Sequence, residues 1–287
     1  ALAIVNPVAG KGLGARVART LAAELADAGL IADIVSTPAP LEAARLASAA
    51  VEDGYERVIA VGGDGTANEV ANGLVGSDVA LGLYPIGSGN DFARALGYPR
   101  KRRELAAFLA RATPRRIDVG EVNGRIFLNA AGVGIDGHVA ERILASSRVV
   151  GPTLGYFVGA LVSIATYTPR PMRVDVDGTL RSGRHLLAVA ANGTHFGSGM
   201  HVAPAAKLDD GLLDVVIAGD LGRWASVVAL AKLYRGTHVD GRSILGFRAR
   251  SLVVELDDAQ PMEVDGEASR TETLRIRVRP GALMVLA

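Results

Sequence analysis

Glycine and polar residues follow directly after one predicted strand of this chain. The segment VGGDGTANEVANGL, residues 61–74, comes after the apolar run YERVIAV and before a run with helical spacing. Glycine leaves space for a ligand beside the main chain, and the first turn of a helix offers unpaired N–H groups to an anion. This arrangement predicts phosphate binding, with a plain strand-to-helix turn as the alternative.

A second glycine-rich loop of similar composition comes after the next predicted strand. The segment GSGNDFA, residues 87–93, follows ALGLYPI and contributes Ser88, Asn90 and Asp91. Thr37 follows the earlier predicted strand IADIVS. In open parallel sheets the carboxyl ends of the strands meet at one edge, where ligands bind. Several such loops on one edge predict a nucleotide pocket.

Two further glycine motifs do not support a more specific assignment. NPVAGKG, residues 6–12, resembles a Walker A loop, but Val5 and Gly12 occupy the positions where that loop needs glycine and serine or threonine. GVGIDG, residues 132–137, matches the dinucleotide fingerprint, yet no Asp or Glu lies between Glu141 and Asp175. We interpret the first as a phosphate-facing turn and the second as a tight turn before a helix.

Acidic residues form two short clusters in the second half of the chain. The segment MEVDGE, residues 262–267, could place a carboxylate near an acceptor hydroxyl, but Asp-Gly is also a hairpin signal. The similar VDVDGT, residues 174–179, is expected to be a turn only. LDDGLLD, residues 208–214, lacks the alternating ligands of an EF-hand and by itself indicates a solvated turn.

The elements that must position these residues change in type along the chain. Over roughly the first 117 residues, apolar strand patterns alternate with amphipathic helical patterns, which predicts a parallel sheet covered by helices. In the first helix the apolar stripe is Val17, Leu21, Leu25 and Ala28. Later segments have hairpin-like alternation and predict an antiparallel, sandwich-like region. We expect an α/β domain at 1–117 and a β-rich domain at 118–287, with the C-terminal tail free to pack back on the first.

Composition narrows the possible functions. The chain has 287 residues, 49% of them hydrophobic, with 31 Lys plus Arg against 30 Asp plus Glu and no cysteine. This balance argues against nucleic-acid binding, and disulfides and a cysteine nucleophile are excluded. The start ALAIVNP lacks the layout of a secretory signal. A cytoplasmic location is therefore expected.

One uncharged stretch, residues 149–169, raises the question of a membrane span. Gly151, Pro152 and Gly155 interrupt it, so we predict a short apolar helix over about 154–165 that is buried or faces a lipid surface. Phe157 and Leu161 are the candidates for outward-facing side chains.

Taken in order, six segments resemble the catalytic domain of the diacylglycerol kinase family, in particular its soluble bacterial lipid kinases. They are NPVAGKG, VGGDGTANEVANGL, LYPIGSGNDFARALG, NAAGVGIDG, ANGTHFGSGMHVAPAAKLDDGLLDVVI and MEVDGE. GGDGT alone also resembles loops of NAD kinases and phosphofructokinases. Its combination with GSGNDFA and VDGE is specific, and the resemblance covers essentially the whole chain.

The resemblance implies an ATP site in the first domain. The positions similar to the family's nucleotide contacts are Thr37, Gly62, Gly63, Asp64, Gly65, Thr66, Ala67, Asn68 and Ser88, with Asn90 and Asp91 on the same edge. Asp64 is expected to act through Mg²⁺ or hydrogen bonds near the phosphates. Ser88 stands where many relatives have threonine, and the hydroxyl is kept.

The resemblance also implies a base and a structural metal ion in the second domain. The proton of the acceptor hydroxyl would pass to Glu267, our preferred base, or to Asp265. A Mg²⁺ ion would be held by the Asp210 side chain and the backbone carbonyls of Lys207 and Leu212.

These expectations describe an ATP- and Mg²⁺-dependent kinase that phosphorylates the hydroxyl of diacylglycerol or a related lipid. It would meet its lipid substrate at the inner face of the membrane through peripheral contact only, without nucleic acid, and possible homodimers stay open. The alternatives are an NAD kinase and a non-catalytic nucleotide-binding regulatory protein.

Overall fold

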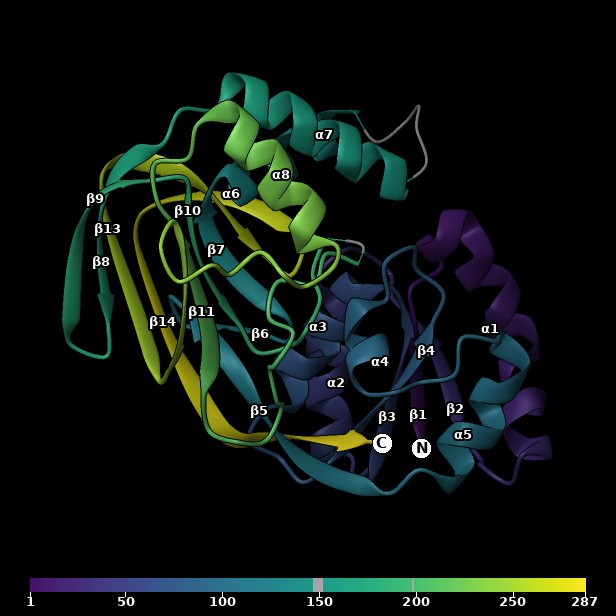
Figure 1. Cartoon of the computed structure of the whole chain (residues 1–287). Coiled ribbons are helices and arrows are strands. Elements are labelled where there is room, and N and C mark those ends of the chain that lie inside the picture. Colours follow the sequence, from purple (N-terminus) through teal and green to yellow (C-terminus); the bar gives the residue numbers. More distant parts are fainter. Residues whose placement is uncertain (147–151, 198) are drawn as a thin grey trace. The chain divides into compact units, whose positions relative to one another are not determined.

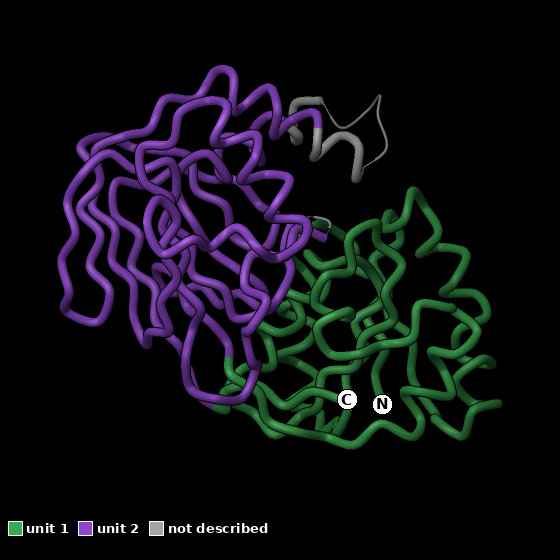
Figure 2. Tube along the Cα trace, in the orientation of Figure 1, with its two compact units in different colours: residues 1–118, 281–287 green, residues 119–280 purple. Residues whose placement is uncertain are grey.

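A computed structural model describes residues 1–146, 152–197 and 199–287 of the chain. The chain forms two compact units, Ala1–Asp118 with Gly281–Ala287 (unit 1) and Val119–Pro280 (unit 2), coloured separately in Figure 2. The predicted boundary after residue 117 lies beside the first of these divisions. The seven C-terminal residues belong to unit 1, so the tail returns to the first domain.

Unit 1 is built on a parallel sheet. Its strand order is β2-β1-β3-β4, and the last residues of β14 add to β4 through the parallel pair Val285 and Leu81. β1, β3 and β4 are apolar runs buried on both faces, as expected for a parallel sheet covered by helices, whereas the edge strand β2 is partly exposed. Their bounds are β1 Leu2–Val5, β2 Asp33–Ser36, β3 Arg57–Gly62, β4 Ala80–Pro85 and β14 Glu267–Leu286.

The helices of unit 1 follow the predicted alternation (Figure 1). In the first helix Val17, Leu21 and Leu25 are buried against the sheet, as their spacing predicts, and Ala28 lies at the C-cap. Burial of each leucine contributes about 1.5–3 kcal/mol. The helices are α1 Ala9–Asp27, α2 Glu42–Glu52, α3 Asp64–Leu74, α4 Asp91–Ala95, the 3₁₀ helix η1 Arg102–Glu104 and α5 Leu105–Arg111.

Unit 2 is antiparallel and β-rich, as predicted. Its strands pair in the order β12-β11-β10-β7-β13-β14, with β8 on β13, β9 on β8, β5 on β14 and β6 on β5. The bounds are β5 Pro114–Val122, β6 Arg125–Phe127, β7 Ala130–Gly134, β8 Arg170–Val176, β9 Thr179–His185, β10 Leu187–Ala191, β11 Leu213–Ala218, β12 Ile244–Ala249 and β13 Ser251–Val264.

Three helices gather on unit 2: α6 Ile135–Ser146, α7 Pro152–Thr166 and α8 Arg223–Leu233. Their inner side chains form one apolar cluster with β10 and β11. The predicted apolar helix corresponds to α7, whose Leu161 packs against this cluster and does not face outward. The side chain of Phe157 lies outside the described residues. Within the described residues, no helix combines the length and apolarity needed to cross a membrane.

Candidate active site

The predicted phosphate-binding loops lie at the switch point of the parallel sheet. From β1 the chain moves first to β2 on one side and then to β3 on the other, so the loops after β1 and β3 diverge at neighbouring strand ends. In open α/β sheets a ligand binds in the crevice at such a point. Asn6 follows β1 and donates from Nδ2 to Thr66 Oγ1 at 3.1 Å. This bond links the two loops across the switch point.

The glycines of these loops are explained by close approach of the two main chains. A Cβ atom on Gly87 would lie 2.6 Å from the Cα of Gly63, so a larger side chain would force GGDGT and GSGND apart. A Cβ atom on Gly62 would lie 2.3 Å from Thr66 Oγ1 within its own loop. The sequence therefore uses glycine here for proximity, since Gly62, Gly63 and Gly87 all have negative or extended φ.

Asp64 begins α3 and ties the two loops together. Its Oδ1 accepts the backbone N–H of Phe92 at 3.1 Å. Gly62, Gly63, Asp64 and Asn90 line a small hollow beside these loops. The first N–H groups of α3 have no acceptor within the helix and can bind an anion.

The other predicted nucleotide contacts divide into accessible and packed residues. Ser88 is exposed, and Thr37 is half-buried after β2, with its N–H donating to Val5 O at 2.8 Å. Thr66, Ala67 and Asn68 are buried within α3, where Asn68 Oδ1 accepts from Asn72 Nδ2 at 3.0 Å. Gly62 is also buried, and its carbonyl accepts the N–H of Ile86 at 2.8 Å. The predicted contacts that are at least partly exposed are Thr37, Gly63, Asp64, Gly65 and Ser88, with Asn90 of the second loop.

Asn90 and Asp91 hold the second loop in shape. Asn90 has a left-handed φ of 52°, accepts the N–H of Gly87 at Oδ1 (3.0 Å) and donates from Nδ2 to the Gly87 carbonyl (2.8 Å). Asp91 is buried and forms an ion pair with Arg94 at 2.6 Å. These two residues support the loop, which leaves Ser88 as its exposed polar group.

In unit 2 the DGE segment forms the hairpin turn between β13 and β14, and its two acids differ. The Asp265 carboxylate accepts three backbone N–H groups, from Leu128 at 2.7 Å, Asn129 at 2.8 Å and Ala130 at 3.1 Å. Such a carboxylate anchors the chain before β7. Glu267 is partly exposed, and its Oε2 accepts from Arg125 Nη2 at 2.6 Å.

A third acid of this hairpin was not singled out from the sequence. Glu263 is 3% exposed, and its Oε1 accepts the N–H of Gly266 at the turn. Glu263 is buried near the end of β13, and the neighbouring Val264 is buried as well. The sequence pattern MEV therefore does not reveal that Glu263 is buried. It supports the turn that carries Glu267.

The predicted metal loop holds an ion pair in this structure. Asp210 Oδ1 accepts the N–H of Leu212 at 3.1 Å, and its Oδ2 pairs with Arg248 of β12. Lys207 is exposed on the same loop. The guanidinium of Arg248 pairs with the carboxylate that would have to bind Mg²⁺. In this arrangement the loop residues do not fit a metal ion. Within the described chain there is no cluster of three or more acids or histidines suited to a metal.

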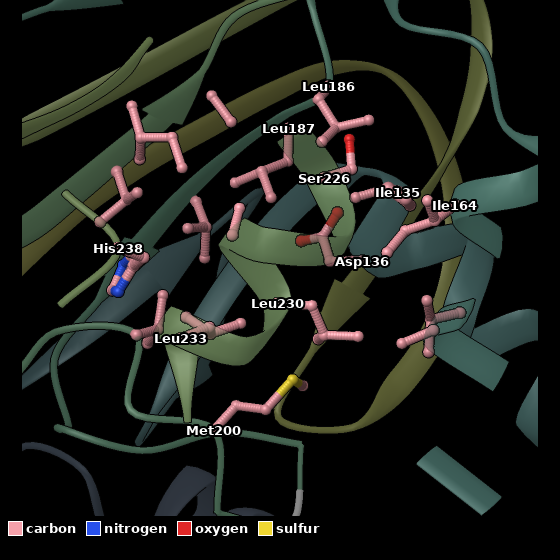
Figure 3. A pocket seen from close by; sticks show the side chains of 18 of the residues that line it. Ile135, Asp136, Ile164, Leu186, Leu187, Met200, Ser226, Leu230, Leu233 and His238 are labelled. Atoms are coloured by element: carbon pink, nitrogen blue, oxygen red, sulfur yellow. The ribbon is translucent and has the colours of Figure 1, made fainter. Parts of the chain in front are cut away.

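Unit 2 also contains a largely apolar pocket of about 110 Å³ between β10, β11 and the helices α6, α7 and α8. Figure 3 shows Ile135, Ile164, Leu186, Leu230 and Leu233 around it. Its lining is mostly aliphatic, which suits an apolar ligand.

One carboxyl group projects into this cavity. Asp136 is 8% exposed, and no side-chain donor among the described residues reaches its oxygens (Figure 3). Burial raises the pKa of Asp136 to about 7, against a weaker opposing effect of the N–H groups of Gly137 and of Asp136 itself. The motif GVGIDG makes room for it, because a Cβ on Gly132 would lie 2.2 Å from Asp136 Oδ2. The sequence predicts only a tight turn here. The available signal for a buried acid is the presence of three glycines around Asp136 in GVGIDG.

Comparison with known proteins places this arrangement in a family. Residues 1–122 match the model described as diacylglycerol kinase catalytic domain, and residues 129–287 match the YegS C-terminal NAD kinase beta sandwich-like domain. A diacylglycerol kinase of Mycobacterium tuberculosis (strain H37Rv) is 31% identical over 294 residues, covering 99% of this chain and 94% of that protein. The chain belongs to the diacylglycerol kinase family. The predicted resemblance and lipid kinase activity are confirmed.

Other relatives of this kinase agree. The diacylglycerol kinase of Bacillus subtilis (strain 168) is 30% identical, over 92% of this chain and 88% of that protein. A Pseudomonas aeruginosa protein described as "probable lipid kinase YegS-like" is 35% identical, over 85% and 80%. The crystal structure of a diacylglycerol kinase from Bacillus anthracis str. Sterne superimposes with a TM-score of 0.78 at 24% identity, over 99% and 95% of the two chains. This likeness confirms the predicted fold class.

Proposed function

We propose that this kinase transfers the γ-phosphoryl group of ATP to the free hydroxyl of diacylglycerol or a closely related glycerolipid, giving a phosphatidate-type product. The observation that carries this proposal is the pairing of two features in one chain. Unit 1 has glycine loops at a sheet switch point, and unit 2 has a hairpin carboxylate and a largely apolar pocket. A phosphate donor and a hydrocarbon acceptor suit these two features respectively.

In unit 1 most contacts to the nucleotide come from main-chain groups. The N–H groups at the start of α3 and the narrow glycine loops receive the phosphates, with Thr37 and Ser88 as hydroxyl contacts. Asp64 fits a Mg²⁺ ion by its chemistry, because that ion prefers oxygen ligands. When bound, Mg²⁺ offsets the charge of the phosphates, which is the main demand of phosphoryl transfer. Asp64 would hold it in place.

In unit 2 we assign the base to Glu267. The proton of the acceptor hydroxyl passes to its carboxylate while the hydroxyl oxygen bonds to the γ-phosphorus, and ADP leaves with the electron pair of the broken P–O bond. Arg125 orients the carboxylate. Asp265, with three N–H groups on its oxygens, positions the turn instead of taking the proton.

The cavity would receive a hydrocarbon chain of the lipid, and Asp136 would donate a hydrogen bond to a lipid oxygen. Its carboxyl has a pKa of about 7, so it keeps a proton below that pH. Asp136→Asn keeps a donor of the same size, whereas Asp136→Leu removes it. We expect the KM for lipid to rise above pH 7 in the wild type, to stay flat in Asp136→Asn and to be high throughout in Asp136→Leu. Identical pH profiles for all three proteins would contradict this contact.

The experiment that tests the function is an ATP turnover assay with three acceptors: diacylglycerol in mixed micelles, NAD in solution and no acceptor. We expect turnover only with diacylglycerol, at a rate that follows its mole fraction in the micelle. Phosphorylation of NAD without a response to lipid would favour the NAD kinase alternative, and no turnover with any acceptor would favour the regulatory protein.

The same proposal includes work at the cytoplasmic face of a membrane through peripheral contact. The structural Mg²⁺ at Asp210 and a homodimer stay predictions. For the ion, Asp210→Ala should abolish any Mg²⁺ dependence of the melting temperature measured without nucleotide. If that dependence is absent from the wild type, the ion pair with Arg248 accounts for the loop.

A further inference from the structure

Helix α8, RWASVVALAKL, is apolar on both of its sides. On the inner side Leu230 and Ser226 are buried and line the cavity together with Leu233. On the outer side Trp224 is 84% exposed and Val228, one turn later, is 53% exposed. A helix that is apolar all round is normally covered all round. The outer side of α8 has no such cover within the described chain.

Helix α7 contacts α8 on the same unit (Figure 1) and also has exposed apolar side chains. Val158 and Val162, also one turn apart, are 47% and 38% exposed. No Asp, Glu, Lys, Arg or His occurs between Pro152 and Thr166. We call the side chains of Trp224, Val228, Val158 and Val162 the outer patch. Exposed apolar groups gathered on two neighbouring helices mark an interaction surface.

The charged residues on and just after α8 are all of one sign. Arg223, Lys232 and Arg235 are exposed on or just after α8, and no acid occurs from residue 221 to residue 239. The nearest acids on either side are engaged. Asp220 is 3.3 Å from Arg184, and Asp240 accepts three backbone N–H groups, from Arg242, Ser243 and Ile244. A partner that is negatively charged at its surface and apolar beneath it complements this surface.

We infer that the outer patch of α8 and α7 docks onto an anionic lipid bilayer, with Trp224 inserted at the boundary between headgroups and acyl chains. This inference rests on the proposed lipid substrate and adds the surface that meets it. Trp is the residue that prefers this boundary, and basic side chains at the helix ends reach the headgroup phosphates. α8 has 11 residues, about 16 Å at 1.5 Å per residue, so it lies in the interface and does not span it. Its inner side lines the cavity, so docking brings the membrane beside the proposed lipid site.

The chain offers a direct probe, because Trp224 is its single tryptophan. We would add vesicles of phosphatidylcholine alone, or of phosphatidylcholine with one third phosphatidylglycerol, to the full chain and record its fluorescence. We expect a blue shift and quenching by brominated acyl chains with the anionic vesicles only. Lys232→Glu and Arg235→Glu should each weaken vesicle binding about fivefold or more, measured by co-sedimentation.

Trp224→Ala should weaken sedimentation with anionic vesicles about tenfold, with unchanged melting temperature. Ile31→Ala is the matched control, since Ile31 of unit 1 is also 84% exposed. It should leave vesicle binding unchanged. Turnover of a water-dispersed short-chain diacylglycerol should be the same in all these variants, which separates docking from the proposed function.

Three results would overturn the docking surface. The first is Trp224 fluorescence that does not change with anionic vesicles on which the enzyme is active. The second is equal binding by wild type and the charge-reversal variants. The third is a dimer in sedimentation equilibrium that shields Trp224 without lipid, which would make the patch an interface between two copies. Absence of turnover with the dispersed diacylglycerol would instead refute the proposed function.

Discussion

Unit 2 contains two hairpin turns with the same Asp-Gly sequence and nearly the same backbone. Asp177 and Gly178 have φ of 47° and 85°, while Asp265 and Gly266 have 48° and 89°. Left-handed φ at both central residues matches the twist of the flanking strands. Only one of the two turns is followed by an acid, since Thr179 stands where the other hairpin has Glu267.

The aspartates of the two turns have the same structural use. Asp177 accepts the N–H of Arg250 at 2.9 Å and the N–H of Ser251 at 2.7 Å, and Asp265 accepts three N–H groups before β7. Each carboxylate fastens the turn to a neighbouring segment. The comparison therefore supports a structural role for Asp265, and it is consistent with the proposal that Glu267, two residues later, is the base.

The largest effect should come from Glu267→Gln. The change keeps the side-chain volume and removes the proton acceptor, so we expect kcat to fall by about 10²–10⁴ with little change in the KM for ATP. Steady-state kinetics with diacylglycerol micelles measures both. Thr179→Ala, the equivalent position of the other turn, is the control and should keep full activity. A rise confined to the KM for ATP would move Glu267 to a binding role.

The turns also illustrate what could be predicted from sequence. Asp-Gly between alternating residues predicted both hairpins, and strand-helix alternation predicted the parallel sheet, because both signals are local. The preference for Glu267 over Asp265 as base came from the family resemblance and stays a prediction. The anchoring role of Asp265 could not be predicted, because its three donors lie more than 130 residues away.

The next largest effect should separate the two aspartates by stability. Asp265→Ala leaves three partly buried N–H groups without an acceptor, and we expect a loss of about 3–5 kcal/mol, or roughly 6–15 °C in melting temperature. Asp177 is exposed, so water can replace its carboxylate, and Asp177→Ala should cost about 1 kcal/mol. Thermal unfolding followed by circular dichroism compares them. Equal losses would mean that burial does not distinguish the two turns.

Other features of the site could not be predicted from the sequence, because the residues in contact are far apart along the chain. Asp210 meets Arg248 from another strand, and Asp136 faces a cavity formed by helices that follow it in the chain. The loops after β3 and β4 were predictable as one edge, since parallel strands fix that geometry. That Asn90 and Asp91 would support their loop required the hydrogen bonds themselves.

A smaller effect is expected from the glycines of the turns. Gly178→Ala and Gly266→Ala both place a side chain at left-handed φ, which costs about 1–2 kcal/mol. Space is open around Gly178, so only this strain should appear there. Gly266→Ala should additionally lower kcat, because it shifts the strand that begins with Glu267. Melting curves and kcat for both variants check this, and unchanged kcat in Gly266→Ala would weaken the assignment of Glu267.

The smallest effect concerns the pH dependence of Asp177. Burial works to raise its pKa, but hydrogen bonds from the backbone of Arg250 and from the side chain and backbone of Ser251 outweigh it, so the pKa lies below its ordinary value of 3.8. Because the folded pKa is the lower one, the stabilisation is complete above pH 3.8 and is lost as the pH falls toward the folded pKa. Asp177→Asn should therefore be slightly less stable than the wild type at pH 7, by about 1 kcal/mol or less, and this difference should shrink as the pH falls below 3.8. A difference in stability that does not shrink over this range would show that the charge of Asp177 does not fasten the turn, and the likeness of the two aspartates would then stop at the backbone.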